Sequence, residues 1–310
     1  MWKYVLKRVL LMIPVLLGVM VFIFFVMELS PGDPASTILG AGATQEAIDQ
    51  LNHELGYDRP LLTRLGSYIF NAFFKGNLGN SYRTRLPVFS GIKPCIPISL
   101  RLALSAILFA VAFGVPIGVL SAVKQYSLLD TIPTVISLFL AALPGFWLGM
   151  MMLYLFSLKL GWFPSYGVDS WKCFVLPTIS LGLPYAAQEM RFTRSSMLDT
   201  IRQDYVRTAR SKGANERRVI WRHALVNALL PVITVTGTNF SALIGGAVVT
   251  ESLYSITGLG TQLVTSIKIK DTPMVMGCTL VLAAICSIVM LGVDLLYAVV
   301  DPRIKAKYSK

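Results

Sequence analysis

One short stretch of the sequence gathers charged groups that could contact a partner. The fifteen residues "DYVRTARSKGANERR" (204–218) hold five basic and two acidic residues, in a chain that is 55% hydrophobic. Exposed Arg207, Arg210 and Lys212 can meet acidic side chains of a soluble protein and speed its encounter with this chain. A basic amphipathic helix can also lie on anionic lipid, so both interpretations stay open.

Two acidic residues could instead carry protons. Glu189 and Asp294 lie within or beside apolar segments, where a charged side chain is costly and is by default a functional candidate. Both are expected near the cytoplasmic boundary, so pairing with Arg191, Arg194 or Arg303 is preferred to a proton relay.

Enzyme chemistry finds little support in the sequence. His53 and His223 are expected on opposite sides of the membrane, and no His-Glu-x-x-His spacing for zinc occurs. No Gly-x-x-x-x-Gly-Lys-Ser/Thr loop is present to hold the phosphates of ATP. We expect no metal and no cofactor in this chain, and any ATP would be bound by a separate subunit.

The four cysteines show no metal-binding spacing. Cys278 and Cys286 fall inside an apolar segment and are interpreted as packing residues. Cys95 and Cys173 fall near the outer ends of two segments, where a disulfide is conceivable but separate packing is preferred.

Long uncharged segments must position these residues. Only 14% of the 310 residues are charged, and a bilayer core of about 30 Å needs roughly 20 apolar residues as helix. Six segments fit: Val9 to Met27, Leu102 to Val123, Thr131 to Leu158, Cys173 to Gln188, Ala224 to Thr250 and Thr272 to Val293. The sequence predicts an all-α membrane protein with six transmembrane helices.

The positions of Lys and Arg predict the orientation. Basic residues gather at the amino terminus, between Arg191 and Arg222, and in the tail after Asp301. Six spans place these three segments on one side, which the positive-inside rule makes cytoplasmic. The net charge of +12 is thereby explained by topology and by contact with the lipid bilayer, and no nucleic acid is needed.

The chain divides into three parts. Residues 1–30 are expected to form the first transmembrane helix, 31–98 a small helical extracytoplasmic cap, and 99–310 a five-helix core with a cytoplasmic helix at about 200–222. In the cap, Thr44 is a predicted N-cap of a helix that ends at Gly56. A second amphipathic helix follows Pro60 and ends near Gly76.

The charged stretch itself predicts a helix, a tight turn and a second helix. At 100° per residue, Tyr205, Val206 and Ala209 share one face. The small Ala209 would let a partner backbone approach, Gly213 suits the left-handed position that ends a helix, and Asn215 suits the N-cap of the next.

At these residues the sequence resembles a known family. The run "QDYVRTARSKGANERRVIWRHALVNALLPVI" (203–233) is similar to the cytoplasmic loop of inner-membrane permease subunits of ABC importers, in the dipeptide, oligopeptide and nickel branch. Further motifs agree in order along nearly the whole chain: "RVLLMIPVLLGV" (8–19), "SPGDPA" (30–35), "ALPGFWLG" (142–149), "RSSML" (194–198), "ESLYSITGLG" (251–260) and "DLLYAVVDPRI" (294–304).

The resemblance implies that the loop is a coupling helix that docks in a cleft on an ATPase subunit. Ala209 and Gly213 match the second Ala and the Gly of the importer signature Glu-Ala-Ala-x-x-x-Gly, while Arg207 and Thr208 replace its first two residues. The later proline, Pro231, is farther from Gly213 than usual. The expected ATPase-coupling residues are Tyr205, Val206, Arg207, Ala209, Arg210, Lys212 and Gly213.

The resemblance also implies the partners. These are a homologous second permease subunit, two cytoplasmic ABC ATPase subunits that carry ATP and Mg, and an extracytoplasmic solute-binding protein, in the bacterial cytoplasmic (inner) membrane. Peptide is the preferred substrate, and nickel or metal-chelate uptake or glutathione uptake are alternatives. A proton-coupled secondary transporter is the alternative from another class, for which midplane acids or an inverted repeat would be expected.

Residues that line the translocation pathway are expected where the spans are kinked or rich in small residues, at the depth of the membrane midplane. The candidates are Pro144, Phe146, Trp147, Asn239, Ser241 and Gly245. Asn239 could bond to a passing peptide or equally to a neighbouring helix. The outer loop and gate is expected at Glu251, Tyr254, Gly258 and Gly260, where Ser255-Ile256-Thr257 departs from the Trp-Pro common in this branch.

Overall fold

The computed structural model describes residues 2–40 and 42–300, with side chains over 5–40 and 42–295. In this part of the chain the regular structure is helical, with one isolated bridge between Asn80 and Pro87. The helices are α1 (Trp2–Leu29), α2 (Pro34–Leu39), α3 (Gln45–Leu55), α4 (Leu61–Lys75), α5 (Val88–Ile92), α6 (Cys95–Val123), α7 (Leu128–Ala142), α8 (Gly145–Met152), η1 (Leu153–Lys159), η2 (Trp171–Phe174), α9 (Val175–Ile201), α10 (Asp204–Ser211), α11 (Glu216–Arg218), η3 (Val219–Ala224), α12 (Leu225–Leu253), α13 (Leu259–Lys268) and α14 (Thr272–Val300).

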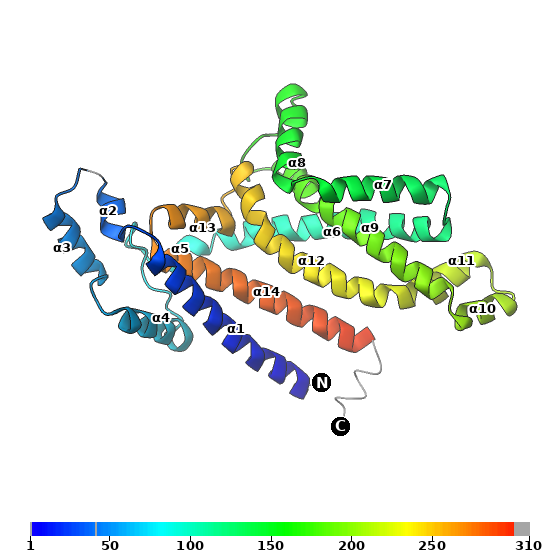
Figure 1. Cartoon of the computed structure of the whole chain (residues 1–310), viewed down its shortest axis with the longest axis horizontal. Helices are drawn as coiled ribbons and strands as arrows, with labels where there is room; N and C mark the ends of the chain where they lie inside the picture. Colours follow the sequence, from blue (N-terminus) through cyan, green and yellow to red (C-terminus); the bar gives the residue numbers. More distant parts are fainter. Residues whose placement is uncertain (1, 41, 301–310) are drawn as a thin grey trace.

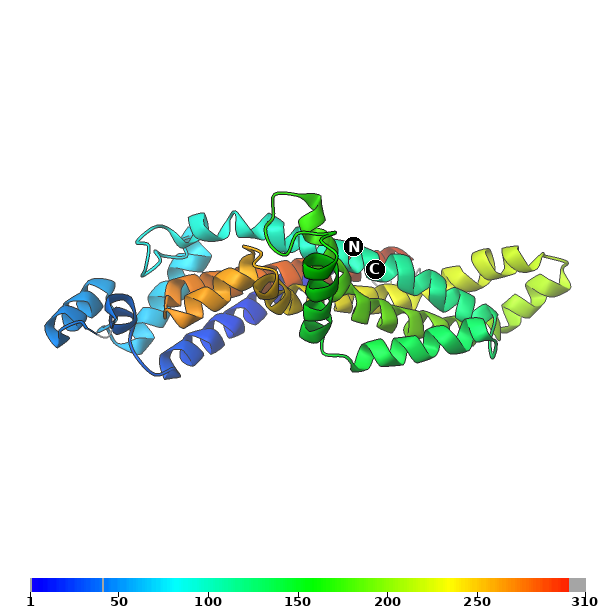
Figure 2. The same ribbon diagram turned by 90° about the horizontal axis from the view of Figure 1, so that it is seen from above.

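The molecule is elongated, with different elements at its two ends. Figure 1 shows the small helices α2, α3 and α4 at one end of the long axis and α10 with α11 at the other, and Figure 2 shows the same separation from above. The long helices α6, α9 and α12 run between these ends. The helices α2 to α4 are therefore far from α10 and α11, and the long helices lie between them (Figure 1).

Four helical stretches are long and apolar enough to cross a membrane, and a bent pair would make a fifth. The four are Val5–Leu29, Val88–Val123, Glu216–Leu253 and Thr272–Leu295. The helix α9 has sufficient length, but polar side chains such as Gln188, Glu189 and Arg191 lower its hydropathy. The predicted six spans are therefore supported in part, by a membrane architecture of four to five apolar spans.

The third predicted segment is not one continuous helix. The helices α7 and α8 meet at 101°, and Figure 1 shows α8 standing across α7. Leu143 is extended (ψ 132°) and Pro144 is the N-cap residue of α8. Proline disfavours helix at the residue before it and lacks the N–H that would continue the helix. The apolar segment predicted over 131–158 is therefore broken at Pro144, one of the positions where a kink was expected.

Small residues let α6 and α9 pack closely. Ala106, Ala110, Gly114 and Gly118 recur every fourth residue on α6 and are all buried. A Cβ added at Gly114 would lie 2.6 Å from the backbone oxygen of Ala186 on α9. Such stripes of small residues allow close contact of helix backbones in membranes. They hold α9 in place for the site described below.

Local signals placed the cap helices correctly. The Thr44 hydroxyl accepts a hydrogen bond from the Ala47 backbone N–H, and α3 ends at Gly56 with φ 69°. The helix α4 begins after Pro60 and ends at Gly76 with φ 61°. Both predicted cap helices are thus confirmed, because capping chemistry depends on nearby residues alone.

The turn between α13 and α14 fastens the cap. The buried Lys270 ammonium donates to the backbone oxygens of Ser30 and, at 2.6 Å, Gly32. Burial lowers the pKa of Lys270, and the negative charges of Glu28 and Asp33 act in the opposite direction. The neighbouring Asp271 carboxylate accepts hydrogen bonds from the Ser81 hydroxyl and, at 3.0 Å, the Tyr82 backbone N–H.

Removing the Asp271 carboxylate should loosen the cap. In Asp271→Ala the buried Ser81 hydroxyl and the Tyr82 N–H lose their acceptor, at about 1–3 kcal/mol for each unsatisfied group. Hydrogen exchange should accelerate in peptides covering 77–87. The control Asp49→Ala removes an exposed carboxylate that accepts a bond only from Gln45 one turn away and should leave this exchange unchanged. Equal exchange in both variants would show that Asp271 does not fasten the cap.

Candidate functional site

The charged segment 204–218 has the local structure that its sequence predicts. The helix α10 spans Asp204–Ser211, and Gly213 adopts φ +79°, in the left-handed region. The Asn215 side chain accepts a hydrogen bond from the Arg218 backbone N–H at 3.1 Å and so caps α11. Helix, turn and helix are therefore held by short-range contacts at the end of the molecule (Figure 1).

One side of α10 is anchored in the permease itself. Val206 is fully buried in a cluster with Val119 of α6, Met197 of α9 and Val219 of η3, and Ala209 packs at the edge of this cluster. A force applied to α10 would pass through this contact to α6 and α9, because packed interiors transmit displacement.

The charged side of α10 is open to a partner. Arg210 forms an ion pair with Glu216 at 2.6 Å, and Arg207 lies 3.7 Å from Asp204. These pairs are exposed, and exposed pairs contribute about 0–1 kcal/mol. Arg207 and Arg210 can therefore exchange partners easily. Tyr205 (45% exposed) and Lys212 are accessible on the same element.

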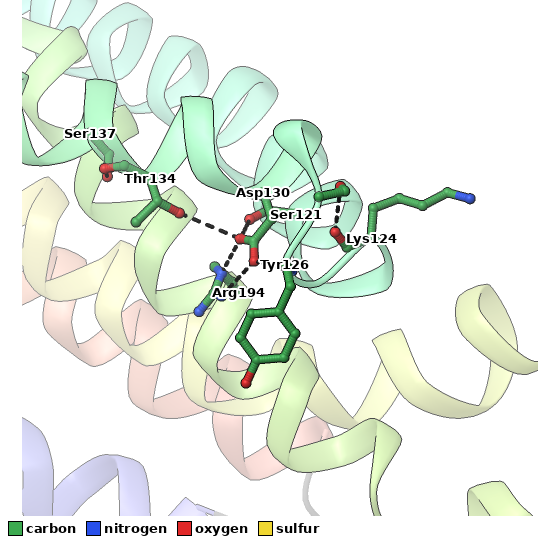
Figure 3. A network of polar contacts seen from close by, with 8 residues as sticks. Ser121, Lys124, Tyr126, Asp130, Thr134, Ser137 and Arg194 are labelled. Carbon is green, nitrogen blue, oxygen red and sulfur yellow. Dashed lines mark hydrogen bonds and ion pairs between the residues drawn. The ribbon is translucent and has the colours of Figure 1, made fainter.

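An ion pair joins three long helices at the end that carries α10. The Arg194 guanidinium of α9 donates hydrogen bonds to both carboxylate oxygens of Asp130 in α7, at 2.5 and 2.8 Å. Asp130 also accepts hydrogen bonds from the Ser121 hydroxyl of α6 at 2.5 Å and from the Tyr126 backbone N–H at 2.9 Å (Figure 3). The start of α7 is thereby held to α6 and α9, so the three helices should move together.

The expected pairing of Glu189 with an arginine is wrong. Glu189 is fully buried near the middle of α9, and it accepts a hydrogen bond from Asn239 of α12 at 2.9 Å. Arg194 pairs with Asp130 instead, since five residues along a helix turn its side chain by about 140°. Asp294 pairs with Arg8 of α1 at 2.9 Å. Arg303, the other proposed partner, lies outside the described residues.

A hollow of about 490 Å³ opens beside the bend between α7 and α8. Phe146 lines it, as do Leu143 and Gly145 on either side of Pro144. The other walls come from α9 and α12, and its polar side chains include Tyr185, Gln188, Arg191 and Thr250. Polar groups in an otherwise apolar concave wall are typical of a site for a small polar ligand.

The remaining pathway candidates lie elsewhere. Asn239 is buried, and its side-chain amide donates a hydrogen bond to Glu189, so it does not line the hollow. Ser241 lines a separate hollow that also includes Arg8 and Asp294. Trp147 is 41% exposed, and Gly245 faces open space, while its neighbour Gly246 lines the hollow.

The outer loop is organised around a buried carboxylate. Glu251, at the end of α12, is fully buried and accepts hydrogen bonds from the Ser99 hydroxyl at 2.5 Å and from the backbone N–H groups of Gly260 and Thr261 at 2.8 and 3.0 Å. The last two donors belong to the first turn of α13, where helices favour a negative charge. Glu251 therefore fixes the start of α13 to α12 and α6.

The two glycines of the loop leave room for this carboxylate. A Cβ at Gly258 would lie 2.3 Å from the Glu251 carboxyl group, and one at Gly260 would lie 2.6 Å from the Val248 backbone. Tyr254 is also buried, and its hydroxyl donates to the Gly149 backbone oxygen at 3.2 Å. The four residues expected at the gate therefore lie in a tightly packed loop, two as buried side chains and two as glycines in close contact with their surroundings.

Sequence reasoning missed the polar residues of α9. Tyr185, Gln188 and Arg191 are spaced three residues apart and lie on one side of a helix. The spacing was visible in the sequence, but the uncharged segment stops at Gln188, and a polar face was not predicted for its expected extension toward Arg194. The four cysteines are free thiols, so Cys95 and Cys173 are separate packing residues as preferred.

Comparisons with known proteins agree with this architecture. Two family models match, "Binding-protein-dependent transport system inner membrane component" over residues 114–306 and the N-terminal component of the same systems over residues 1–103. The dipeptide transport system permease protein DppB of Alkalihalophilus pseudofirmus is 38% identical, over 98% of this chain and 100% of its own length. The glutathione transport system permease protein GsiC of Escherichia coli K12 is also 38% identical, over 99% of this chain and 100% of its own length.

A solved structure shares the fold. The inward-facing MetNI methionine ABC transporter aligns with a TM-score of 0.57 at 18% identity, over 68% of this chain and 96% of that chain. This likeness concerns the fold. The two family models together match residues 1–103 and 114–306, which is nearly the whole chain. The chain belongs to the family of inner membrane components of binding-protein-dependent transport systems, which are multi-pass membrane permeases whose ATPase activity resides in separate subunits.

Proposed function

We propose that this chain forms one half of the translocation pathway for peptides in an ATP-driven importer. The observation that carries the proposal is α10, which is anchored on the long helices through Val206 and exposes Arg207 and Lys212 to a soluble partner. The hollow at the bend of α7 and α8 opens on the surface of a single chain. A second permease subunit would complete its wall.

The proposed assembly has two permeases, two cytoplasmic ATPases that hold ATP and Mg, and an extracytoplasmic solute-binding protein. Six spans with both termini in the cytoplasm are proposed. The remaining span would be α9, whose polar side chains would be kept from the lipid by neighbouring helices and by the partner permease. The division into 1–30, 31–98 and 99–310 is proposed with them. The cap and the loop around Glu251 would receive the binding protein, and α10 would receive the ATPase.

Peptide is proposed because the similar DppB is named for dipeptides. The similar GsiC is named for glutathione, which is itself a peptide derivative, so glutathione is the alternative within the class. Both compounds combine amide groups with free carboxylates, which suits a hollow lined by hydrogen-bond donors and a guanidinium.

Purification of the complex followed by reconstitution tests the function. Gentle isolation through a tag on this chain should recover a second permease and ATPase subunits, identified by mass spectrometry. Proteoliposomes with ATP and binding protein should then take up a dipeptide. Recovery of this chain alone, with uptake that survives ATP depletion and stops when the proton gradient collapses, would contradict the importer.

The turn at Gly213 gives a test of the coupling role. In Gly213→Val the β-branched side chain opposes φ +79°, at a cost of at least about 1–2 kcal/mol, so the turn should distort. We expect ATP hydrolysis to lose its stimulation by loaded binding protein, while membrane insertion is retained. Gly213→Asn is the matched control, because asparagine tolerates the left-handed region, and it should keep most of the stimulation. Full stimulation in Gly213→Val would refute docking at this turn.

A further inference from the structure

The helix α9 has two faces with different tasks. One face is built for packing, since a Cβ on Gly182 would lie 2.8 Å from the Ala106 backbone oxygen of α6. The other face carries polar side chains at intervals of three or four residues, namely Tyr185, Gln188, Arg191, Ser195 and Asp199. Spacing of three and four places side chains on one side of a helix. A polar face this long is unusual on a helix of a membrane protein and calls for a polar environment.

Two hollows follow this face. The hollow of about 490 Å³ includes Tyr185, Gln188 and Arg191, and a second one of about 360 Å³ includes Gln188, Arg191, Ser195 and Asp199. Gln188 and Arg191 line both hollows. Arg191 therefore borders both hollows and is the third of the five polar residues on this face.

Arg191 keeps hydrogen-bond donors for a ligand, whereas those of Arg194 bind Asp130. Arg194, one turn along the same helix, holds Asp130 with two charge-assisted bonds (Figure 3). Arg191 makes a long hydrogen bond, 3.3 Å from its Nη1 to the Ser137 backbone oxygen of α7. Within residues 5–40 and 42–295, no carboxylate forms an ion pair with Arg191. A half-buried arginine in this position retains donors for an anion.

We propose that Arg191, together with Gln188 and Tyr185, forms a subsite in the translocation pathway for a carboxylate of the transported peptide. The guanidinium fork matches a carboxylate with two parallel N–H donors. The Gln188 amide and the Tyr185 hydroxyl supply further donors. This inference rests on the proposed function, because it needs a peptide in the hollow.

The subsite would affect how fast the peptide crosses the membrane rather than how tightly the binding protein binds it. The binding protein selects the solute outside the membrane, whereas Arg191 lies within the bundle. A carboxylate that leaves water to enter an apolar passage loses hydration, and a charge-assisted pair with Arg191 replaces it. The free C-terminal acid of a peptide should therefore pass faster than the uncharged amide of the same peptide.

The test compares alanyl-alanine with alanyl-alanine amide in proteoliposomes that contain the whole complex, ATP and saturating loaded binding protein. Loading of the binding protein with each compound is measured separately, so uptake reports the passage through the membrane subunits. The wild type should transport the free acid roughly tenfold faster. Arg191→Gln should lose most of the acid uptake and keep the amide uptake. Arg191→Lys, which retains the charge without the fork, should fall between the two.

Lys124→Gln is the matched control, since it also removes one positive charge, and the Lys124 side chain points away from the Asp130 network (Figure 3). It should keep the wild-type preference. An unchanged preference in Arg191→Gln, or an equal fall for acid and amide, would overturn the subsite. Loss of the second permease from Arg191→Gln complexes would instead make Arg191 a contact between subunits. Wild-type vesicles that hydrolyse ATP and import neither compound would refute the proposed function itself.

Discussion

Replacing Gly118 by valine should destabilise the permease by forcing α6 and α9 apart. A Cβ at this position would lie 2.5 Å from the Met190 backbone oxygen and 2.8 Å from the Thr193 Cβ. The backbones of α6 and α9 would have to separate, because the atom nearest to the added Cβ is a main-chain oxygen and not a flexible side chain. Overpacking of this kind costs about 1–3 kcal/mol, and occasionally more, and the valine methyl groups add to the clash.

The measurement is the temperature at which the detergent-solubilised complex loses its monodisperse state. The Gly118→Val complex should lose it well below the wild type or fail to assemble. Gly18→Val is the control, because a Cβ at this position on α1 would have no atom of the described residues within 4 Å. Equal stability of the two variants would mean that the close contact between α6 and α9 does not persist in the complex.

The effect should extend to function, because α6 and α9 position both ends of the site. Their packing places the polar face of α9 on the hollow and supports the cluster that buries Val206. If α9 shifts away from α6, the bidentate pair between Arg194 and Asp130 should weaken as well. Any assembled Gly118→Val complex should therefore show ATP hydrolysis that responds weakly to loaded binding protein.

Glu251→Ala should abolish transport while leaving the ATPase end intact. The change removes the acceptor of three donors, the buried Ser99 hydroxyl and Gly260 N–H and the half-buried Thr261 N–H. Each donor left without a partner costs about 1–3 kcal/mol. The start of α13 should then lose its fixed position and the outer loop its shape. Since α10 lies beyond the other end of α12 (Figure 1), assembly with the ATPases should persist.

Two measurements check this separation of effects. Dipeptide uptake by Glu251→Ala should fall by at least tenfold with basal ATP hydrolysis retained, and hydrogen exchange should rise in peptides covering 256–266. Ser252→Ala is the neighbouring control, because this exposed hydroxyl donates only to the Val248 backbone oxygen of its own helix. Normal uptake by Glu251→Ala would show that the buried carboxylate is not needed for the outer loop.

The buried contacts of this chain explain why the family resemblance could locate functional segments but not their internal order. The motif "ESLYSITGLG" (251–260) located the outer loop, yet it did not indicate that the Glu251 side chain is buried and accepts hydrogen bonds from the first turn of α13. That arrangement depends on Ser99, which lies 152 residues away in the sequence. The same holds for Asn239, whose partner Glu189 comes from another long helix.

The sequence alone determined the features that depend on neighbouring residues. Thr44, Gly56 and Gly76 bound the cap helices, and Gly213 with Asn215 shapes the coupling turn, because caps and left-handed glycines act within a few residues. The ordered motifs determined the family, since their spacing spans nearly the whole chain. Long apolar runs determined the membrane class, because hydropathy adds along a helix.

Only the tertiary structure decided which polar groups meet. Glu189, Arg191 and Arg194 are close in sequence, yet they face Asn239, the hollow and Asp130 respectively, since each residue turns a helix by about 100°. The break at Pro144 became a 101° bend because α8 packs across α9 and α12. The close approach of α6 and α9 needed glycines on one helix to meet backbone oxygens of the other. Contacts of this kind are set by packing between distant segments, and no local pattern encodes them.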